Sequence, residues 1–168
     1  KRLYLTTSLV HEASPDRVDP KCRAAGVCGG CVFQHLSLSS QLELKSNYFK
    51  EQLSPLEPNE WLEPLVGSGF GYRTKARLGV KYVEKKKCVL VGFREKRKSF
   101  ITDTDQCPII VKKCKHLIPD LRALIEELSI KRSIPQVELA AGDTQVALIF
   151  RHLEPCEGRD LELLRGFS

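Results

Sequence analysis

Seven cysteines occur in this chain of 168 residues, and three of them are close enough in sequence to bind one inorganic centre. Cys22, Cys28 and Cys31 follow the spacing C-x5-C-x2-C, and Gly29 and Gly30 separate the closest pair. Glycine tolerates the backbone angles that let a short loop aim neighbouring thiolates at a common point. The chemistry that this pattern indicates is therefore coordination of a metal by thiolates.

A fourth thiolate ligand is expected from Cys107, which Pro108 follows directly. Proline after a ligating cysteine recurs in the loops that hold iron–sulfur clusters. Four thiolates suit an iron–sulfur cluster or zinc, and zinc sites usually combine two closely spaced pairs, so this spacing favours the cluster. The other three cysteines are expected to pack as small hydrophobic side chains: Cys88, Cys114 and Cys156.

Other site chemistries find less support in the sequence. Seven is an odd number of cysteines, and the first residues do not resemble a secretory signal, which argues against a disulfide framework. A cluster implies a reducing compartment, so we expect the cytoplasm. The four histidines are scattered singly and are expected to be structural. No apolar run is long enough to span a membrane. The sequence contains no methionine, which suggests a piece of a longer protein.

The net charge of +6 is concentrated in one segment. Between residues 73 and 98, eleven lysines and arginines occur with two glutamates, which makes this segment +9 and the rest of the chain −3. A focused positive potential attracts polyanions, and such binding weakens steeply with salt. Aromatic side chains between the cations suit stacking on unpaired RNA bases, although a solvated charged face with aromatics turned to the core would give the same pattern.

The expected elements form an α+β fold in which an antiparallel sheet has flanking helices and carries the cysteine loop. A strand is expected over residues 1–10, and a helix over 40–53 with a capping box at Ser40, followed by a linker over 55–64. Alternation predicts a strand over 72–82 with Arg73, Lys75, Arg77 and Lys81 on its outward face. Strands over 88–93 and 99–104 would continue it as an antiparallel meander.

The remaining elements follow from helical spacing and turn signals. A helix is expected over 117–128, kinked or restarted at Pro119, then a hairpin of strands 136–141 and 144–153 around Gly142–Asp143, and a helix over 159–165. The glycine-rich run over 67–71 resembles a nucleotide loop. Strand-like alternation follows it, however, so we interpret it as a flexible turn.

Four motifs occur in order along the chain: Cys22-x5-Cys28-Gly29-Gly30-Cys31-x2-Gln34-His35, Gly71-Tyr72-Arg73 leading to Arg77-Leu78, Val91-Gly92-Phe93-Arg94, and Cys107-Pro108. Together they resemble the bacterial 23S rRNA uracil-C5 methyltransferases of the iron–sulfur type, from about Ser14 to the C-terminus. The resemblance implies that Cys22, Cys28, Cys31 and Cys107 bind a 4Fe–4S cluster in a central domain that recognises folded rRNA. Gln34 and His35 match the motif without an assigned role.

The resemblance also implies a domain organisation. Residues 1–13 would end a preceding OB-like RNA-binding domain, residues 14–168 would form the central domain, and the helix over 40–53 would be available to pack on the catalytic domain. The S-adenosylmethionine site, the cysteine nucleophile and the carboxylate base of that family have no counterpart in this sequence. We therefore expect the RNA-recognition portion of a methyltransferase, inactive by itself, with 23S rRNA as partner and a monomeric state.

Five residues are expected to contact RNA: Arg73, Arg77, Phe93, Arg94 and Lys96. The planar guanidinium group of arginine suits phosphates and base edges, and an aromatic ring can stack on a base. DNA is not expected as a partner. Two alternatives stay open, namely a stand-alone RNA-binding module without methyltransferase activity and a zinc or redox protein.

Overall fold

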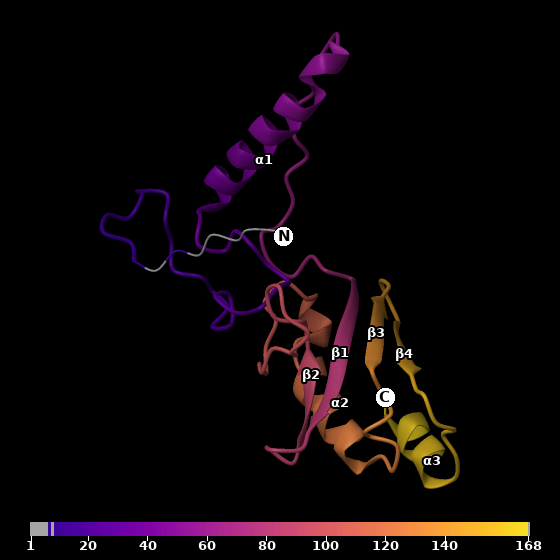
Figure 1. Cartoon of the computed structure of the whole chain (residues 1–168). Helices are drawn as coiled ribbons and strands as arrows, with labels where there is room; N and C mark the ends of the chain where they lie inside the picture. Colours follow the sequence, from indigo (N-terminus) through magenta and orange to yellow (C-terminus); the bar gives the residue numbers. More distant parts are fainter. Residues whose placement is uncertain (1–6, 8, 168) are drawn as a thin grey trace. The chain divides into compact units, whose positions relative to one another are not determined.

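The computed structural model describes residue 7 and residues 9–167. The chain divides into two compact units, one formed by residues 1–20 with 33–64 and the other by residues 21–32 with 65–168. Figure 1 labels the helices and strands along the chain. The strand predicted over residues 1–10 lies mostly outside the described residues, and residues 7, 9 and 10 have no regular structure.

The first unit contains α1 (Leu38–Leu53), which the short 3-10 helix η1 (Ser54–Leu56) follows directly. The predicted capping box at Ser40 is wrong, because Ser37 is the cap and its Oγ accepts the backbone N–H of Ser40 at 3.2 Å. A cap satisfies a backbone donor that the first helical turn leaves without a partner. No residue of α1 is buried, although the ring of Phe49 contacts the ring of Trp61 edge to face.

The second unit is built on a four-stranded antiparallel sheet with the order β2-β1-β3-β4. Its strands are β1 (Lys75–Val83), β2 (Cys88–Gly92), β3 (Gln136–Ala141) and β4 (Val146–Arg151). In β1 the apolar positions Ala76, Leu78 and Val80 are buried, whereas the three cations between and beside them are exposed. The predicted α+β class and the alternation of the first strand are confirmed.

The predicted meander is wrong in its third strand. Residues 99–104 form no strand after β2: they fold back on residues 93–95 through an isolated bridge between Arg94 and Ile101 and two backbone hydrogen bonds, from Glu95 to Phe100 and from Thr102 to Phe93. The sheet continues instead on the other side of β1, which pairs with β3. Gly79 and Gly92 face each other across β1 and β2, and a Cβ on Gly79 would clash with Cδ1 of Ile101. The segment 99–104 therefore packs closely against the sheet where Gly79 and Gly92 lie. The edge of β1 that does not pair with β2 pairs with β3.

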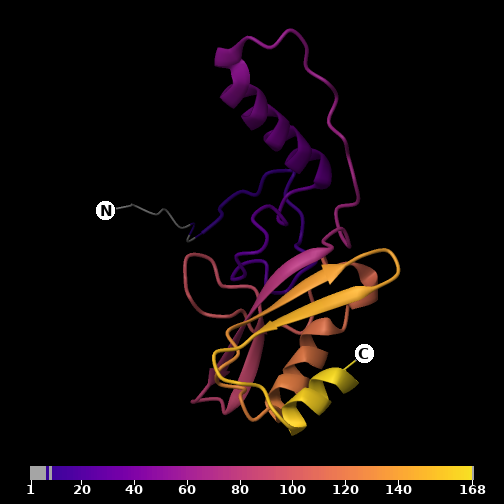
Figure 2. The ribbon, with the colours of Figure 1, turned by 90° about the vertical axis from the view of Figure 1, so that its right-hand side faces the viewer.

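Two helices complete this unit, α2 (Leu117–Glu127) and α3 (Arg159–Gly166), which lie together beside the strands in Figure 2. Pro119 does not kink α2, because it lies in the first turn, where backbone N–H groups have no partner within the helix. Cys114 and Cys156 pack with the core, as predicted. No helix in the described part of the chain has both the length and the apolar character needed to cross a bilayer.

Asp160 anchors α3 to the end of α2 and should make stability depend on pH. Its carboxylate is buried and accepts hydrogen bonds from the Oγ of Ser129 at 2.5 Å and from its N–H at 2.9 Å. These bonds hold the pKa of Asp160 below its ordinary value. A depressed folded-state pKa contributes stability above the unfolded pKa of about 3.9, and this contribution is lost as pH falls through the folded pKa.

We therefore expect Asp160→Asn to lower the midpoint of thermal unfolding by several degrees at pH 7, because the amide offers a donor where Ser129 already donates. The deficit should shrink as the pH is lowered below about 4. Thermal unfolding followed by circular dichroism at both pH values tests this, with the exposed Glu157→Gln as the matched control. A deficit that is the same at both pH values would contradict the linkage.

Candidate metal centre and nucleic-acid interface

The cysteine loop, residues 21–32, is a compact series of turns within the second unit. The backbone N–H of Ala25 donates to the carbonyl of Cys22 at 3.0 Å, and the N–H of Cys28 donates to the carbonyl of Ala24 at 2.7 Å. Cys28 is buried, and its Sγ accepts the N–H of Gly30 at 3.4 Å. Backbone donors to cysteine sulfur are among the features that tune thiolate-bound clusters.

A second segment lies directly against the cysteine loop. We call residues 93–100, which follow β2, the basic loop. The N–H of Gly29 donates to the carbonyl of Arg94 at 2.8 Å, and Cys28 and Glu95 form an isolated antiparallel bridge. A Cβ on Gly29 would lie 3.0 Å from that carbonyl, and one on Gly30 would lie 3.4 Å from the ring of Phe93. The two glycines are thus needed for close approach of the two loops.

Lys96 makes two hydrogen bonds from the basic loop to the cysteine loop. Its backbone N–H donates to the carbonyl of Val27 at 2.8 Å, and its Nζ donates to the carbonyl of Ala25 at 2.8 Å. Lys96 is half-buried. The sequence predicts Lys96 as an RNA contact, and that role stays a prediction; in the structure its ammonium donates to the cysteine loop.

Cys107 lies near two of the other predicted ligands. Burial raises the pKa of its thiol, the backbone N–H groups of Ile109 and Ile110 lower it, and the charges of Cys31 and Cys22 raise it further. Such an effect requires that the sulfur atoms of these cysteines lie close enough to interact. The Cys107 thiol is therefore within electrostatic range of Cys31 and Cys22.

The glycine-rich run leads into the segment beside Cys107. Gly71 has a φ of +63°, and its N–H donates to the carbonyl of Pro108 at 2.9 Å. A left-handed residue at this point is readily supplied by glycine, because other residues meet a steric penalty from Cβ. Arg73 continues the contact, since its N–H donates to the carbonyl of Ile109 at 2.7 Å. The run therefore makes a structural turn that leads toward β1.

The donor set of the site is four thiols, which is the chemistry of iron–sulfur clusters and of zinc sites with four cysteine ligands. Within the described residues, no group of three histidine, cysteine, aspartate or glutamate side chains lies close enough to hold a single metal ion. The residue types, the proximity of Cys107 to two partners and the buried Cys28 fit a cluster. The four-cysteine site remains a prediction.

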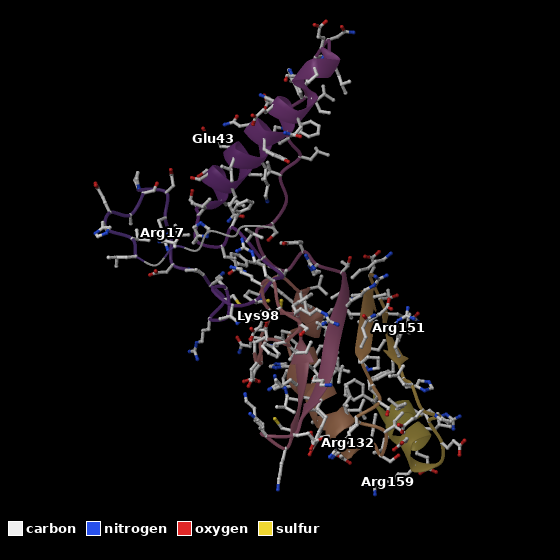
Figure 3. The ribbon with its side chains drawn as sticks, viewed as in Figure 1. Arg17, Glu43, Lys98, Arg132, Arg151 and Arg159 are labelled. Carbon is white, nitrogen blue, oxygen red and sulfur yellow. The ribbon has the colours of Figure 1, made fainter. Side chains whose placement is uncertain are left out.

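The predicted RNA-contacting side chains fall into distinct environments. Arg73 is half-buried, with its guanidinium 5.5 Å from the centre of the Phe93 ring. Phe93 is half-buried and packs against the core, so its ring is engaged on the protein side. Arg94 is exposed, and its guanidinium donates to the carbonyl of Ser99 at 3.2 Å. Figure 3 labels Lys98 on the same loop.

Arg77 belongs to a charge ladder across three strands that sequence reasoning missed. Its Nε lies 3.7 Å from Glu138 on β3, and Nε of Arg151 on β4 lies 2.6 Å from the same carboxylate. The hydrogen bond from Arg151, followed by the charge of that residue and of Arg77, holds the pKa of Glu138 below its ordinary value. Because Glu138 offsets part of its charge, Arg77 is a weaker RNA candidate than Arg94. The pairing of β3 with both β1 and β4 creates this ladder.

The sequence of this chain is similar to those of known proteins. No protein-family model matches it. A 23S rRNA (uracil(1939)-C(5))-methyltransferase RlmD of Alcanivorax borkumensis is 51% identical over 92% of this chain. The RlmD of Nitrosococcus oceani is 50% identical over 95% of the chain, and that of Hahella chejuensis is 46% identical over 92%. The chain is homologous to part of RlmD. It spans about a third of the length of these curated relatives.

The homology confirms the resemblance that the four motifs predicted. The RlmD relatives are named for methylation of a uracil in 23S rRNA, which matches the predicted class of enzyme. Because the match covers only part of each RlmD relative, the activity of the whole protein belongs to what we propose next.

Proposed function

We propose that this chain is the RNA-recognition portion of an S-adenosylmethionine-dependent 23S rRNA uracil-C5 methyltransferase that acts in the cytoplasm. The observation that carries this proposal is 50–51% identity to RlmD proteins over more than nine-tenths of the chain. The strong positive charge of the segment 73–98 supports an RNA partner, since phosphate contacts dominate the affinity of nucleic-acid binding.

Within this function, Cys22, Cys28, Cys31 and Cys107 bind a 4Fe–4S cluster. The support is the proximity of Cys107 to two of the other thiols, together with the backbone donor to Cys28. A bound cluster supplies a covalent cross-link between the cysteine loop and the segment that follows the basic loop. Methyl transfer from a sulfonium requires no electrons, so the cysteines act in structure and recognition.

The chain's own residues then hold the RNA without reacting with it. Attack of a nucleophile on C6 of uracil makes C5 able to accept a methyl group, and such activation is a covalent step. We assign no residue of this chain to that step. The exposed Arg94 binds phosphate, and so does Arg73, whose guanidinium lies over the ring of Phe93.

The proposal is tested by measuring RNA binding and methyl transfer separately. We expect the 168-residue chain to bind a 23S rRNA segment in a salt-dependent manner and to transfer no methyl group from labelled S-adenosylmethionine, whereas the longer gene product does both. A longer product that binds RNA and transfers no methyl group would favour a stand-alone RNA-binding module. Binding that does not change with salt would exclude the segment 73–98 as the RNA surface.

The same comparison tests the proposed packing of α1 on the catalytic domain. A helix of 16 residues without a buried residue has little tertiary support within its unit. Its neighbourhood also exposes large apolar side chains, including Tyr48, Phe49 and Leu56. Amide hydrogen exchange over residues 38–53 should be fast in the 168-residue chain and slow in the longer product. Equal exchange in both would contradict this packing.

A further inference from the structure

The contacts between the cysteine loop and the basic loop concern the backbone as well as side chains. Gly29 donates to Arg94, Lys96 donates to Val27, and Cys28 bridges Glu95, so the two segments are joined at three successive positions of the basic loop. Backbone hydrogen bonds of this kind fix the separation and register of the two segments. The position of the basic loop is therefore set by the conformation of the cysteine loop.

Lys96 adds a side-chain hydrogen bond to the backbone contacts between the two loops. Its Nζ donates at 2.8 Å to the carbonyl of Ala25, in the turn that leads to Cys28. Hydrogen bonds from a charged donor are roughly twice as strong as those between neutral groups. The placement of Lys96 thus suits a role in holding the cysteine loop.

The rest of the basic loop is tied internally and would move with Lys96. The guanidinium of Arg94 donates to the carbonyl of Ser99, and the N–H of Glu95 donates to the carbonyl of Phe100 at 2.9 Å. Nζ of Lys98 lies 3.4 Å from the carboxylate of Glu95. These bonds make the outer part of the loop one unit whose attachment to the cysteine loop includes Lys96.

We propose that Lys96 is a positioning residue that couples the metal centre to the RNA-binding surface. It holds the turn at Ala25 in the conformation that presents Cys28, and the same bonds fix the basic loop that carries Arg94 to RNA. Loss of the metal then releases the basic loop and weakens RNA binding. This inference rests on the proposed function, because it takes the four cysteines as ligands and the basic loop as an RNA surface.

The test compares Lys96→Met with Lys85→Met in the full 168-residue chain after anaerobic reconstitution with iron and sulfide. Lys85 is exposed in the turn between β1 and β2, at the opposite end of β2 from the basic loop. Methionine preserves much of the length of the side chain and removes its charge and donors. Lys96→Arg serves as the conservative variant, since it retains a cationic donor.

Three readouts follow the coupling. Iron release to a chelator should be about tenfold faster in Lys96→Met than in the unchanged chain, and close to unchanged in Lys85→Met and Lys96→Arg. Trypsin should cleave after Arg97 and Lys98 faster in Lys96→Met and in the metal-free chain. In filter binding, the unchanged chain should bind an rRNA segment about tenfold more weakly after its metal is removed. The difference in RNA affinity between the metal-bound and the metal-free chain should be smaller in Lys96→Met.

The outcomes separate this inference from the function on which it rests. If the unchanged chain binds iron and RNA, and Lys96→Met releases iron and resists trypsin just as the unchanged chain does, the coupling is wrong and the proposed function stands. If the unchanged chain takes up neither iron nor sulfide, the metal centre itself is wrong, and the inference falls with it. If Lys96→Met lost RNA affinity equally in the metal-bound and the metal-free chain, with iron release unchanged, the coupling would be wrong and Lys96 would be a direct RNA contact.

Discussion

Replacement of Cys28 by serine is expected to remove bound iron and to lower the midpoint of thermal unfolding by about 10 °C or more. Cys28 is buried, bridges Glu95 and accepts a backbone hydrogen bond at its sulfur. A serine hydroxyl does not replace a thiolate as a ligand of iron at neutral pH, because its proton is far less acidic. The cross-link between the cysteine loop and the segment at Cys107 would then be lost.

The measurement is iron and sulfide content per chain, together with absorbance near 400 nm and thermal unfolding. About four irons per chain are expected before substitution and close to none after it. Cys88→Ser and Cys156→Ser are the matched controls, since both cysteines are half-buried and belong to the set predicted to pack as small hydrophobic side chains. Retention of iron and of the unfolding midpoint in Cys28→Ser would contradict the metal centre, and zinc in place of iron would identify the other thiolate-bound metal.

The second large effect is expected on RNA binding when Arg73 and Arg94 are both changed to glutamine. Each arginine that contacts a phosphate releases condensed counterions, so the double change should weaken binding about ten- to a hundredfold at moderate salt. It should also reduce the slope of log affinity against log salt by about 1.4 to 1.8, which corresponds to two phosphate contacts. Arg94 is exposed on the basic loop, and Arg73 lies on the ring of Phe93.

Filter binding across a salt series, with the unfolding midpoint measured in parallel, distinguishes lost contacts from lost structure. The matched control is Arg159→Gln with Arg165→Gln, which removes two exposed positive charges from α3. Figure 3 labels Arg159 on α3, away from Lys98 of the basic loop. An equal loss of affinity in both double variants would mean that net charge alone attracts the RNA and that the basic loop is not the binding surface.

Phe93 shows why an aromatic residue beside cations is ambiguous in a sequence. The pattern of Phe93 between basic residues suited stacking on RNA bases as well as packing on the core. In the structure its ring packs against the core and lies close to Gly30, where a Cβ would be 3.4 Å away. A flat apolar ring is stabilised by burial wherever the fold offers a surface, and local sequence does not tell which surface that is.

Local pattern was sufficient for several features of this protein. The alternation in β1 predicted its buried and exposed faces, the turn pair Gly142–Asp143 predicted the hairpin of β3 and β4, and the cysteine spacing with its neighbouring motifs predicted the homology to RlmD. These features depend on residues close in sequence, where periodicity and turn chemistry act directly.

Tertiary structure decided the features that depend on residues far apart in the chain. The pairing of β1 with β3, the charge ladder on Glu138 and the contact of Lys96 with the cysteine loop each join segments separated by tens of residues. The sequence showed the charge of Arg77 and Lys96 but not their partners, because a long side chain binds whichever carbonyl or carboxylate the fold places within reach. Sequence by itself therefore determined which chemical groups the protein carries, whereas packing decided which of them are exposed and which are paired with other groups of the chain.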